Sequence, residues 1–337
     1  MMMRGWLTVL LAAAAAASCY SPPAVNGQTD AATPDAAVDA SIDAAISIDG
    51  CTPQTVVCGD GIDQNCDGAD EPCPINDRAT GAIDISAGGD FTTDVRFAKD
   101  DLGNTTCGGA GGRDVYFEIN LPARETVYFD TFGSDFDSML RIYPGKRCLQ
   151  LGGGIGGIAC ADDACGSGQE QTALSLPSGR SCIVVDQQLN PGNAGEFGAL
   201  KMHVIRTGRD AVGLEAAPSP IDGDTCTGTL SNSASLCGAG VNTDLAKDVA
   251  YFVLACPAQT VQLVADTCAG TNFDSVLTVN TPTAETFCND DSANCAATNQ
   301  ASKLDVVLAN ALIHILTVDG VNPQCGAYSL AYTITRN

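Results

Sequence analysis

Apolar and polar residues alternate along much of the chain after residue 76, as they do in β-strands that bury one face. Val115, Phe117, Ile119 and Leu121 are the apolar positions of the clearest example. More short strands are predicted near 126–129, 138–143, 174–176, 183–185 and 200–204. Turn residues separate these segments and long helical patterns are lacking, so we predict an all-β fold of the sandwich type.

The same series of segments then occurs a second time. RDVYFEINLPA at 113–123 matches KDVAYFVLACPA at 247–258, and DFDSML at 135–140 matches NFDSVL at 272–277. The spacing between matched residues stays between 128 and 137 positions along the repeat, which indicates a tandem duplication. We therefore predict two β-sandwich domains, at 76–210 and 211–337.

The first residues resemble a bacterial lipoprotein signal. Arg4 precedes an apolar stretch at 6–17, which is too short to span a bilayer, and Cys19 follows small residues. The resemblance implies a signal peptide at 1–18, acylation of Cys19 and an outer-membrane or cell-surface location. Ala16 departs from the leucine usual in this motif, so ordinary cleavage and secretion stay an alternative. Residues 19–50 are rich in Ala, Asp and Pro and are expected to form a disordered tether.

Cysteine content places the chain in an oxidising compartment. Seventeen cysteines are too many for a reduced cytosolic protein, and setting Cys19 aside leaves an even number to pair. Spacing suggests local Cys148–Cys160 and Cys288–Cys295 bridges, and a Cys256–Cys268 bridge across a hairpin. The segment 51–75 adds four more candidates: Cys51, Cys58, Cys66 and Cys73. The repeats hold five and seven cysteines, so full pairing requires at least one bridge between them.

Net charge excludes one class of partner. The chain carries 40 acidic and 16 basic residues, a formal charge of −24, which repels nucleic-acid phosphates. Such a charge suits divalent cations or simple solubility outside the cell.

The acidic segment 51–75 has the spacing that opens a calcium loop. Asp63, Asn65 and Asp67 alternate before Gly68, so that side-chain oxygens can converge on one ion. Further ligands are expected from three neighbouring acids: Asp60, Asp70 and Glu71. Pro74 stands where an EF-hand has its bidentate glutamate, so this is not an EF-hand. The alternative is an acidic linker pinned by disulfides.

A second set of acids recurs at matched positions of the two repeats. Asp137 has its counterpart in Asp274. The other members are Asp162 and Asp163 in the first repeat, and Asp290 and Asp291 in the second. These acids predict either one calcium site per domain or turn caps formed with backbone N–H groups. Calcium is the one cofactor that either acidic pattern suggests.

Two families resemble parts of this chain. The blocks DVYFEINLPA, GSDFDSMLRIY, ACADD and CIVVD resemble bacterial pre-peptidase C-terminal domains, which are jelly-roll sandwiches beside secreted peptidases. The segment CGDGIDQNCDG at 58–68 resembles the proposed metal-binding repeat of myxobacterial surface proteins. The resemblance implies two tandem jelly-roll-like domains behind a cystine-rich acidic module.

Catalytic motifs are missing from the sequence. It lacks H-E-x-x-H, G-x-S-x-G and Walker A patterns, and its two histidines, His203 and His314, lie in predicted strands. Asp162 and Asp163 are expected to point to opposite faces of a strand. We therefore predict a non-catalytic surface lipoprotein that acts as a binding, adhesion or scaffold module, stabilised by calcium if the acidic patterns bind it, with an extracellular protein, matrix or polysaccharide as its partner. The alternative is an accessory, substrate-contacting subunit of a secreted hydrolase or peptidase.

Overall fold

A computed structural model provides the three-dimensional structure of the chain. It describes residues 52–54, 56–102, 107, 112–151, 159–166, 168–188, 198–230, 237, 246–280, 286–295, 300–309 and 312–337. The predicted signal peptide, the lipidation site Cys19, the tether at 19–50 and Cys51 lie outside these residues. No helix within the described ranges is long and apolar enough to cross a membrane.

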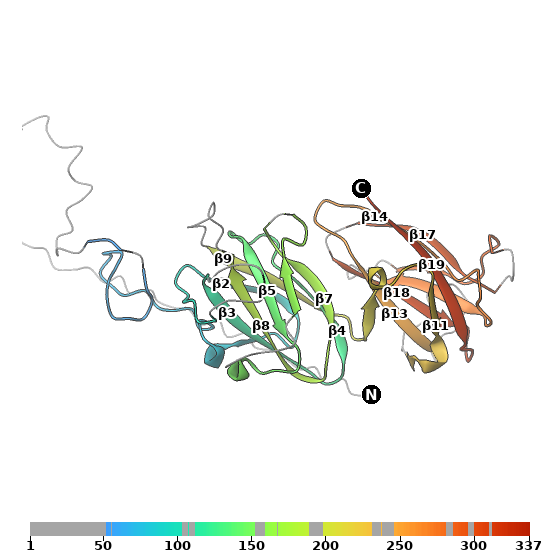
Figure 1. Cartoon of the computed structure of the whole chain (residues 1–337), viewed down its shortest axis with the longest axis horizontal. Helices are drawn as coiled ribbons and strands as arrows, with labels where there is room; N and C mark the ends of the chain where they lie inside the picture. The colour runs from blue at the N-terminus through green and yellow to red at the C-terminus, as the bar shows by residue number, and fades with distance from the viewer. Residues whose placement is uncertain are drawn as a thin grey trace, which may run out of the picture. The chain divides into compact units, whose positions relative to one another are not determined.

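The first repeat folds into two facing sheets (Figure 1). One sheet has the order β1-β3-β8-β5-β6 and the other β2-β9-β4-β7. The strands are β1 (Ile83–Asp84), β2 (Gly89–Asp94), β3 (Asp114–Leu121), β4 (Glu125–Asp130), β5 (Ser138–Tyr143), β6 (Ala159–Asp162), β7 (Gln171–Leu176), β8 (Gly179–Gln187) and β9 (Ala199–Arg206). When β2 to β9 are lettered B to I, the sheets become BIDG and CHEF, which is the strand order of a jelly roll.

The core of the first repeat lies between these sheets. Phe117 of β3 and Ile183 of β8 come from one sheet, and Phe129 of β4 and Met202 of β9 from the other. All four side chains are almost fully buried. Since both sheets contribute to one apolar cluster, the predicted sandwich is confirmed.

The second repeat has the same topology. Its sheets run β10-β13-β18-β15-β16 and β11-β19-β14-β17, with β12 paired to β13. The strands are β10 (Ala211–Gly213), β11 (Ile221–Asp224), β12 (Thr229–Leu230), β13 (Lys247–Leu254), β14 (Val261–Asp266), β15 (Ser275–Asn280), β16 (Thr286–Asn289), β17 (Lys303–Leu308), β18 (Ile313–Gly320) and β19 (Ala327–Arg336). Val115 pairs with Val185 in the first repeat as Val249 pairs with Val318 in the second. The matched sequence blocks therefore occupy equivalent strands.

Strands β3, β4, β5 and β8 of the first repeat are buried more completely than one-sided alternation predicts. All six residues of β5 are buried, and Tyr116 on the outer face of β3 is only 4% exposed. Ala79, Leu102 and Leu151 pack against this outer face near Tyr116 and Tyr143. The expectation of one exposed face holds for β3 at Asn120 but was wrong at Tyr116, because segments before and between the strands cover that part of the face.

The disulfides differ from the local pairings expected from spacing. In the first repeat the bridges are Cys107–Cys160 and Cys148–Cys182. In the second they are Cys237–Cys288, Cys268–Cys295 and Cys226–Cys325. The predicted Cys148–Cys160, Cys288–Cys295 and Cys256–Cys268 pairs were therefore wrong, because the bridges join strands and loops that only the folded topology brings together.

One prediction about the disulfides is confirmed. Cys165 of the first repeat is bonded to Cys256 of the second, so a bridge does join the repeats. Cys58 is bonded to Cys73, and Cys66 is also disulfide-bonded. Bridges of this number indicate an extracellular or otherwise oxidising environment.

Candidate metal centres

Strand pairing brings the repeated acids together at one edge of each sandwich. Asp137 directly precedes β5, and Asp162 is the last residue of the neighbouring strand β6. Because β5 and β6 pair with Met139 opposite Asp162, the start of one strand lies beside the end of the other. In the second repeat, Asp274 precedes β15 and Asp290 follows β16, which pairs with β15.

Three carboxylates converge in each repeat. Asp137, Asp162 and Asp163 each offer an oxygen within 4.8 Å of the oxygens of the other two. Asp274, Asp290 and Asp291 meet the same criterion. Oxygens bound to a single calcium ion lie at most about 5 Å apart, given Ca–O distances of about 2.3–2.6 Å. The spacing in both clusters therefore fits a shared cation.

Asp162 and Asp163 do not point to opposite faces, contrary to the expectation from strand geometry. β6 ends at Asp162, and Asp163 adopts a left-handed backbone conformation with φ of 55°. Strand alternation stops where the strand stops, so both carboxylates turn toward Asp137. A non-glycine residue in this conformation is uncommon, and aspartate is among the residues that tolerate it best.

The clustered carboxylates repel one another in the absence of a cation. Burial and the charges of Asp274 and Asp291 raise the pKa of Asp290 to about 6. Burial and Asp291 raise the pKa of Asp274, while burial and Asp163 raise that of Asp162. A bound cation would reverse this effect, because an adjacent positive charge favours the ionised form of a carboxyl group.

Two oxygens of the second cluster lack protein partners. Oδ1 of Asp274 and Oδ1 of Asp290 are both buried without a hydrogen bond. In the first cluster, Oδ2 of Asp162 accepts a hydrogen bond from Gln188 Nε2 at 3.1 Å. Turn capping through backbone N–H groups was the alternative role for these acids, and Oδ1 of Asp274 takes no part in such a cap.

A buried hydroxyl network supports each cluster in the same way. Oγ1 of Thr131 lies 2.7 Å from Oγ of Ser138 and accepts the N–H of Glu170. The equivalent residues are Thr267, Ser275 and Ser302, with Thr267 Oγ1 2.8 Å from Ser275 Oγ. Ser138 and Ser275 directly follow Asp137 and Asp274, so this network holds the backbone next to each of these acids.

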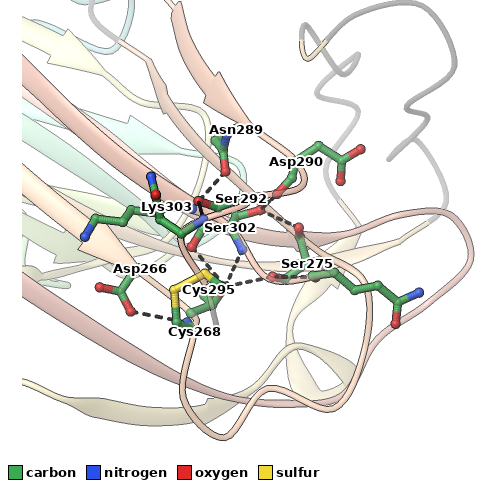
Figure 2. Close-up of a disulfide and its surroundings, with 12 residues drawn as sticks. Asp266, Cys268, Ser275, Asn289, Asp290, Ser292, Cys295, Ser302 and Lys303 are labelled. Atoms are coloured by element: carbon green, nitrogen blue, oxygen red, sulfur yellow. Dashed lines mark hydrogen bonds between the residues drawn. A yellow bond between two sulfur atoms is a disulfide. The ribbon is translucent and has the colours of Figure 1, made fainter. Parts of the chain in front are cut away.

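Figure 2 shows Ser275 and Ser302 of this network in the second repeat. Ser302 Oγ donates to the backbone carbonyls of Ser275 and Asp290, so it ties the acidic loop to β15. The Cys268–Cys295 disulfide closes the same loop a few residues after Asp291. Cys165 lies two residues after Asp163 and anchors the equivalent loop of the first repeat to Cys256.

Sequence reasoning missed Glu170. This residue directly precedes β7, is fully buried, and accepts the N–H of Asp163 on Oε1 at 2.8 Å. Burial is the main cause that raises its pKa to about 7, and the charges of Asp162 and Asp163 add to the shift. The second repeat has Ser302 at this position, so the acids that match between the repeats do not include Glu170.

The acids of the 51–75 segment mostly accept hydrogen bonds from the segment itself. Asp63 Oδ2 accepts the N–H of Gly68 at 2.8 Å, and Asp70 Oδ2 accepts that of Gly61 at 2.7 Å. Asp60 accepts from the backbone of Ile62 and from Gln64.

The side-chain amide of Asn65 donates to Asp67 and Glu71. Gly68 has φ of +102°, the freedom that the predicted loop requires of a glycine. Within the described part of the chain, none of these loop acids belongs to a group of three residues whose ligand atoms lie within 4.8 Å of one another.

The remaining metal-binding candidate and the two histidines have structural roles instead. Cys58, Cys73 and Asp77 lie close enough to share a metal, but the two sulfurs form a disulfide and are not thiolate ligands. His203 of β9 contacts buried Asp130, with Nδ1 3.2 Å from Oδ2. His314 is buried within β18.

Comparisons with known proteins find little similarity. No family model matches the chain, and no curated protein does. An uncharacterised protein from Burkholderia cenocepacia aligns at 10% identity and TM-score 0.20, over 74% of this chain and 82% of its own. The CUB1-EGF-CUB2 domain of human MASP-1/3 aligns at 9% identity and TM-score 0.19, over 73% and 99%. The ANXUR2 extracellular domain from Arabidopsis thaliana aligns at 10% identity and TM-score 0.21, over 73% and 87%. Scores this low carry no functional argument.

Proposed function

We propose that this chain is a non-catalytic binding module of the cell surface, in which each β-sandwich is stabilised by one calcium ion. The observation that carries the proposal is the recurrence of one three-carboxylate cluster in both repeats. A cluster retained at equivalent positions, with oxygens close enough to share an ion, favours a common ligand over chance surface charge.

Calcium suits these clusters better than other common cations. All the candidate ligand atoms are carboxylate oxygens, which are hard ligands, and neither cluster includes a histidine or a thiolate. Magnesium requires near-ideal octahedral geometry and keeps much of its water, whereas calcium accepts irregular oxygen sites on loops.

A bound calcium would strengthen the sandwich edge. Each cluster joins the residue before β5 or β15 to the loop that follows the neighbouring edge strand. An ion at this point would remove the repulsion among the acids and hold the loop in one conformation. A ligand that binds only the folded form stabilises it by about 2.7 kcal/mol at a hundredfold excess over its Kd.

The test is a calcium titration of the exported chain by isothermal titration calorimetry, with its disulfides intact. We expect the wild-type chain to bind two calcium ions, and the triple variant Asp137→Asn, Asp162→Asn and Asp163→Asn to bind one fewer. A second equivalent should disappear in the variant Asp274→Asn, Asp290→Asn and Asp291→Asn. Unchanged stoichiometry in both triple variants would overturn the proposal. Asp63→Ala with Asp67→Ala serves as the comparison for the 51–75 segment.

We further propose that Cys19 anchors the chain to the outer membrane or cell surface and that its partner is an extracellular protein, matrix or polysaccharide. The lipobox-like sequence before Cys19 supports the anchor, and the disulfides agree with export. Labelled palmitate should be incorporated into the wild-type chain and not into Cys19→Ala. Equal label in both, or none in the wild type, would disprove the anchor.

A further inference from the structure

We propose that Glu170 supplies a fourth negative charge to the first calcium site and makes it the tighter of the two. This inference rests on the proposed function, because it concerns the same acidic clusters. It differs from that proposal in predicting that the two sites are unequal, and it names the residue responsible.

Glu170 is held against the first cluster by the fold. It directly precedes β7, and its backbone exchanges hydrogen bonds with Thr131, 3.0 Å for the Thr131 N–H and 2.7 Å for the Glu170 N–H. Its side chain is fully buried and reaches Asp163, whose N–H it accepts on Oε1 at 2.8 Å. The carboxylate is therefore fixed beside the loop that presents Asp162 and Asp163.

The two oxygens of Glu170 have unequal surroundings. Oε2 is buried and has no hydrogen-bond partner. A buried carboxylate oxygen without a partner is costly, and no positively charged residue forms a salt bridge with Glu170 within the described part of the chain. The charged groups that act on it are Asp162 and Asp163, both of the same sign. A cation in the cluster would remove this conflict.

The second repeat provides an internal comparison. Ser302 stands at the equivalent position and makes the same backbone hydrogen bonds with Thr267, at 2.9 and 3.0 Å. Its hydroxyl is neutral and shares its one proton between the carbonyls of Ser275 and Asp290, so it is already satisfied. The first site thus has four nearby carboxylates and the second has three. The number of charged groups around a calcium ion is one of the features that set its affinity.

Glu170 could instead act only by holding the backbone of Asp163 and Ala164, whose N–H groups both lie beside its carboxylate. Glutamine at this position keeps the acceptor for the Asp163 N–H and removes the charge. A purely structural role would therefore survive Glu170→Gln, whereas a charge-supplying role would not. The two roles are separated by a single conservative variant.

The experiment measures calcium affinity at each site alone by calorimetry on the full exported chain. The variant Asp274→Asn, Asp290→Asn, Asp291→Asn leaves the first site, and the corresponding first-repeat variant leaves the second. We expect the first site to bind at least about tenfold more tightly, and Glu170→Gln to remove most of that difference. If the two single-site variants, both with Glu170 unchanged, bind calcium equally tightly, the inference is wrong.

Controls distinguish this inference from the proposed function. Glu125→Gln replaces another buried glutamate of the first repeat, which pairs with Arg206, and should leave both affinities unchanged. Calcium-free thermal unfolding checks that Glu170→Gln folds. If neither site binds calcium, the proposed function fails. If both bind and Glu170→Gln matches the wild type, only the role of Glu170 is disproved.

Discussion

Buried charge on the outer face of β3, β8 and β5 is the most unusual feature at the residue scale. Arg141 and Asp186 form an ion pair at 2.5 Å, and both side chains are 2% exposed. Asp114 lies on the same face and accepts the N–H groups of Asp101 and Leu102 at 2.9 and 2.8 Å. Burial raises the pKa of Asp114 to about 7 and that of Asp186 to about 6.

These shifts predict how stability depends on pH. A carboxyl group whose pKa is higher in the folded form binds more protons there than in the unfolded chain. Its contribution to stability is full below about pH 4 and is lost as the pH rises through about 7 for Asp114. We expect Asp114→Asn to flatten this part of the curve, because asparagine does not titrate. Relative to the wild type, the variant should be more stable at pH 8 than at pH 5. Asparagine keeps an acceptor oxygen for the N–H groups of Asp101 and Leu102.

The measurement is urea unfolding at pH 5 and pH 8 with the disulfides intact. Asp222→Asn, on an exposed position of β11, is the matched control and should change little. If Asp114→Asn and the wild type lose the same stability between pH 5 and pH 8, the buried carboxyl group does not titrate as described.

The sequence predicted those residues of the candidate sites that occur at matched positions in both repeats. Asp137 and Asp274 stood out because each precedes a matched strand and each has acidic neighbours at a similar spacing. Glu170 was not predictable in this way, since its counterpart is Ser302. The left-handed conformation of Asp163 was also hidden, because the sequence does not mark where β6 ends.

At the scale of strands, local patterns predicted the elements well. The segment Ser138–Tyr143 was expected as a strand and forms β5, because β-branched, aromatic and long apolar residues suit a pleated sheet. What the pattern did not reveal is which faces become covered. Tyr116 is buried by residues outside the strand, such as Leu102 and Leu151, and the alternation within β3 contains no information on them.

Disulfide connectivity required the topology as well as the strands. Cys160 and Cys288 occupy equivalent positions on β6 and β16, and their partners are Cys107 and Cys237. Cys165 and Cys295 follow the two acidic loops, yet one bonds to Cys256 of the other repeat and the other to Cys268 of its own. Short sequence spacing is a poor guide because strands distant in sequence lie side by side in a jelly roll.

At the scale of the whole folded part, the two sandwiches share contacts. Tyr128 of β4 belongs to one apolar cluster with Ala250, Ile313 and Ile315 of the second repeat. Gln171 Nε2 donates to the carbonyl of Ala255 at 2.9 Å, close to the Cys165–Cys256 bridge. Thr126 Oγ1 also donates to the carbonyl of Ala211 at 2.8 Å. We expect the repeats to unfold together.

The Cys165–Cys256 bridge should be responsible for much of this cooperativity, and a second bridge provides a matched control. Cys165–Cys256 closes 91 residues across the repeats, while Cys226–Cys325 closes 99 residues within the second repeat. Loops of similar length restrict the unfolded chain to a similar extent, so removing either bridge should cost a comparable amount, about 2–5 kcal/mol.

Only the first bridge links the two cores, so the variants should differ in the number of transitions. Differential scanning calorimetry of Cys165→Ser with Cys256→Ser should resolve two transitions, since each sandwich keeps its own apolar core. Cys226→Ser with Cys325→Ser should give one transition at a lower temperature. A single transition in both variants would show that the shared apolar cluster suffices to couple the repeats. Two transitions in the wild type would mean that the repeats are independent despite the bridge.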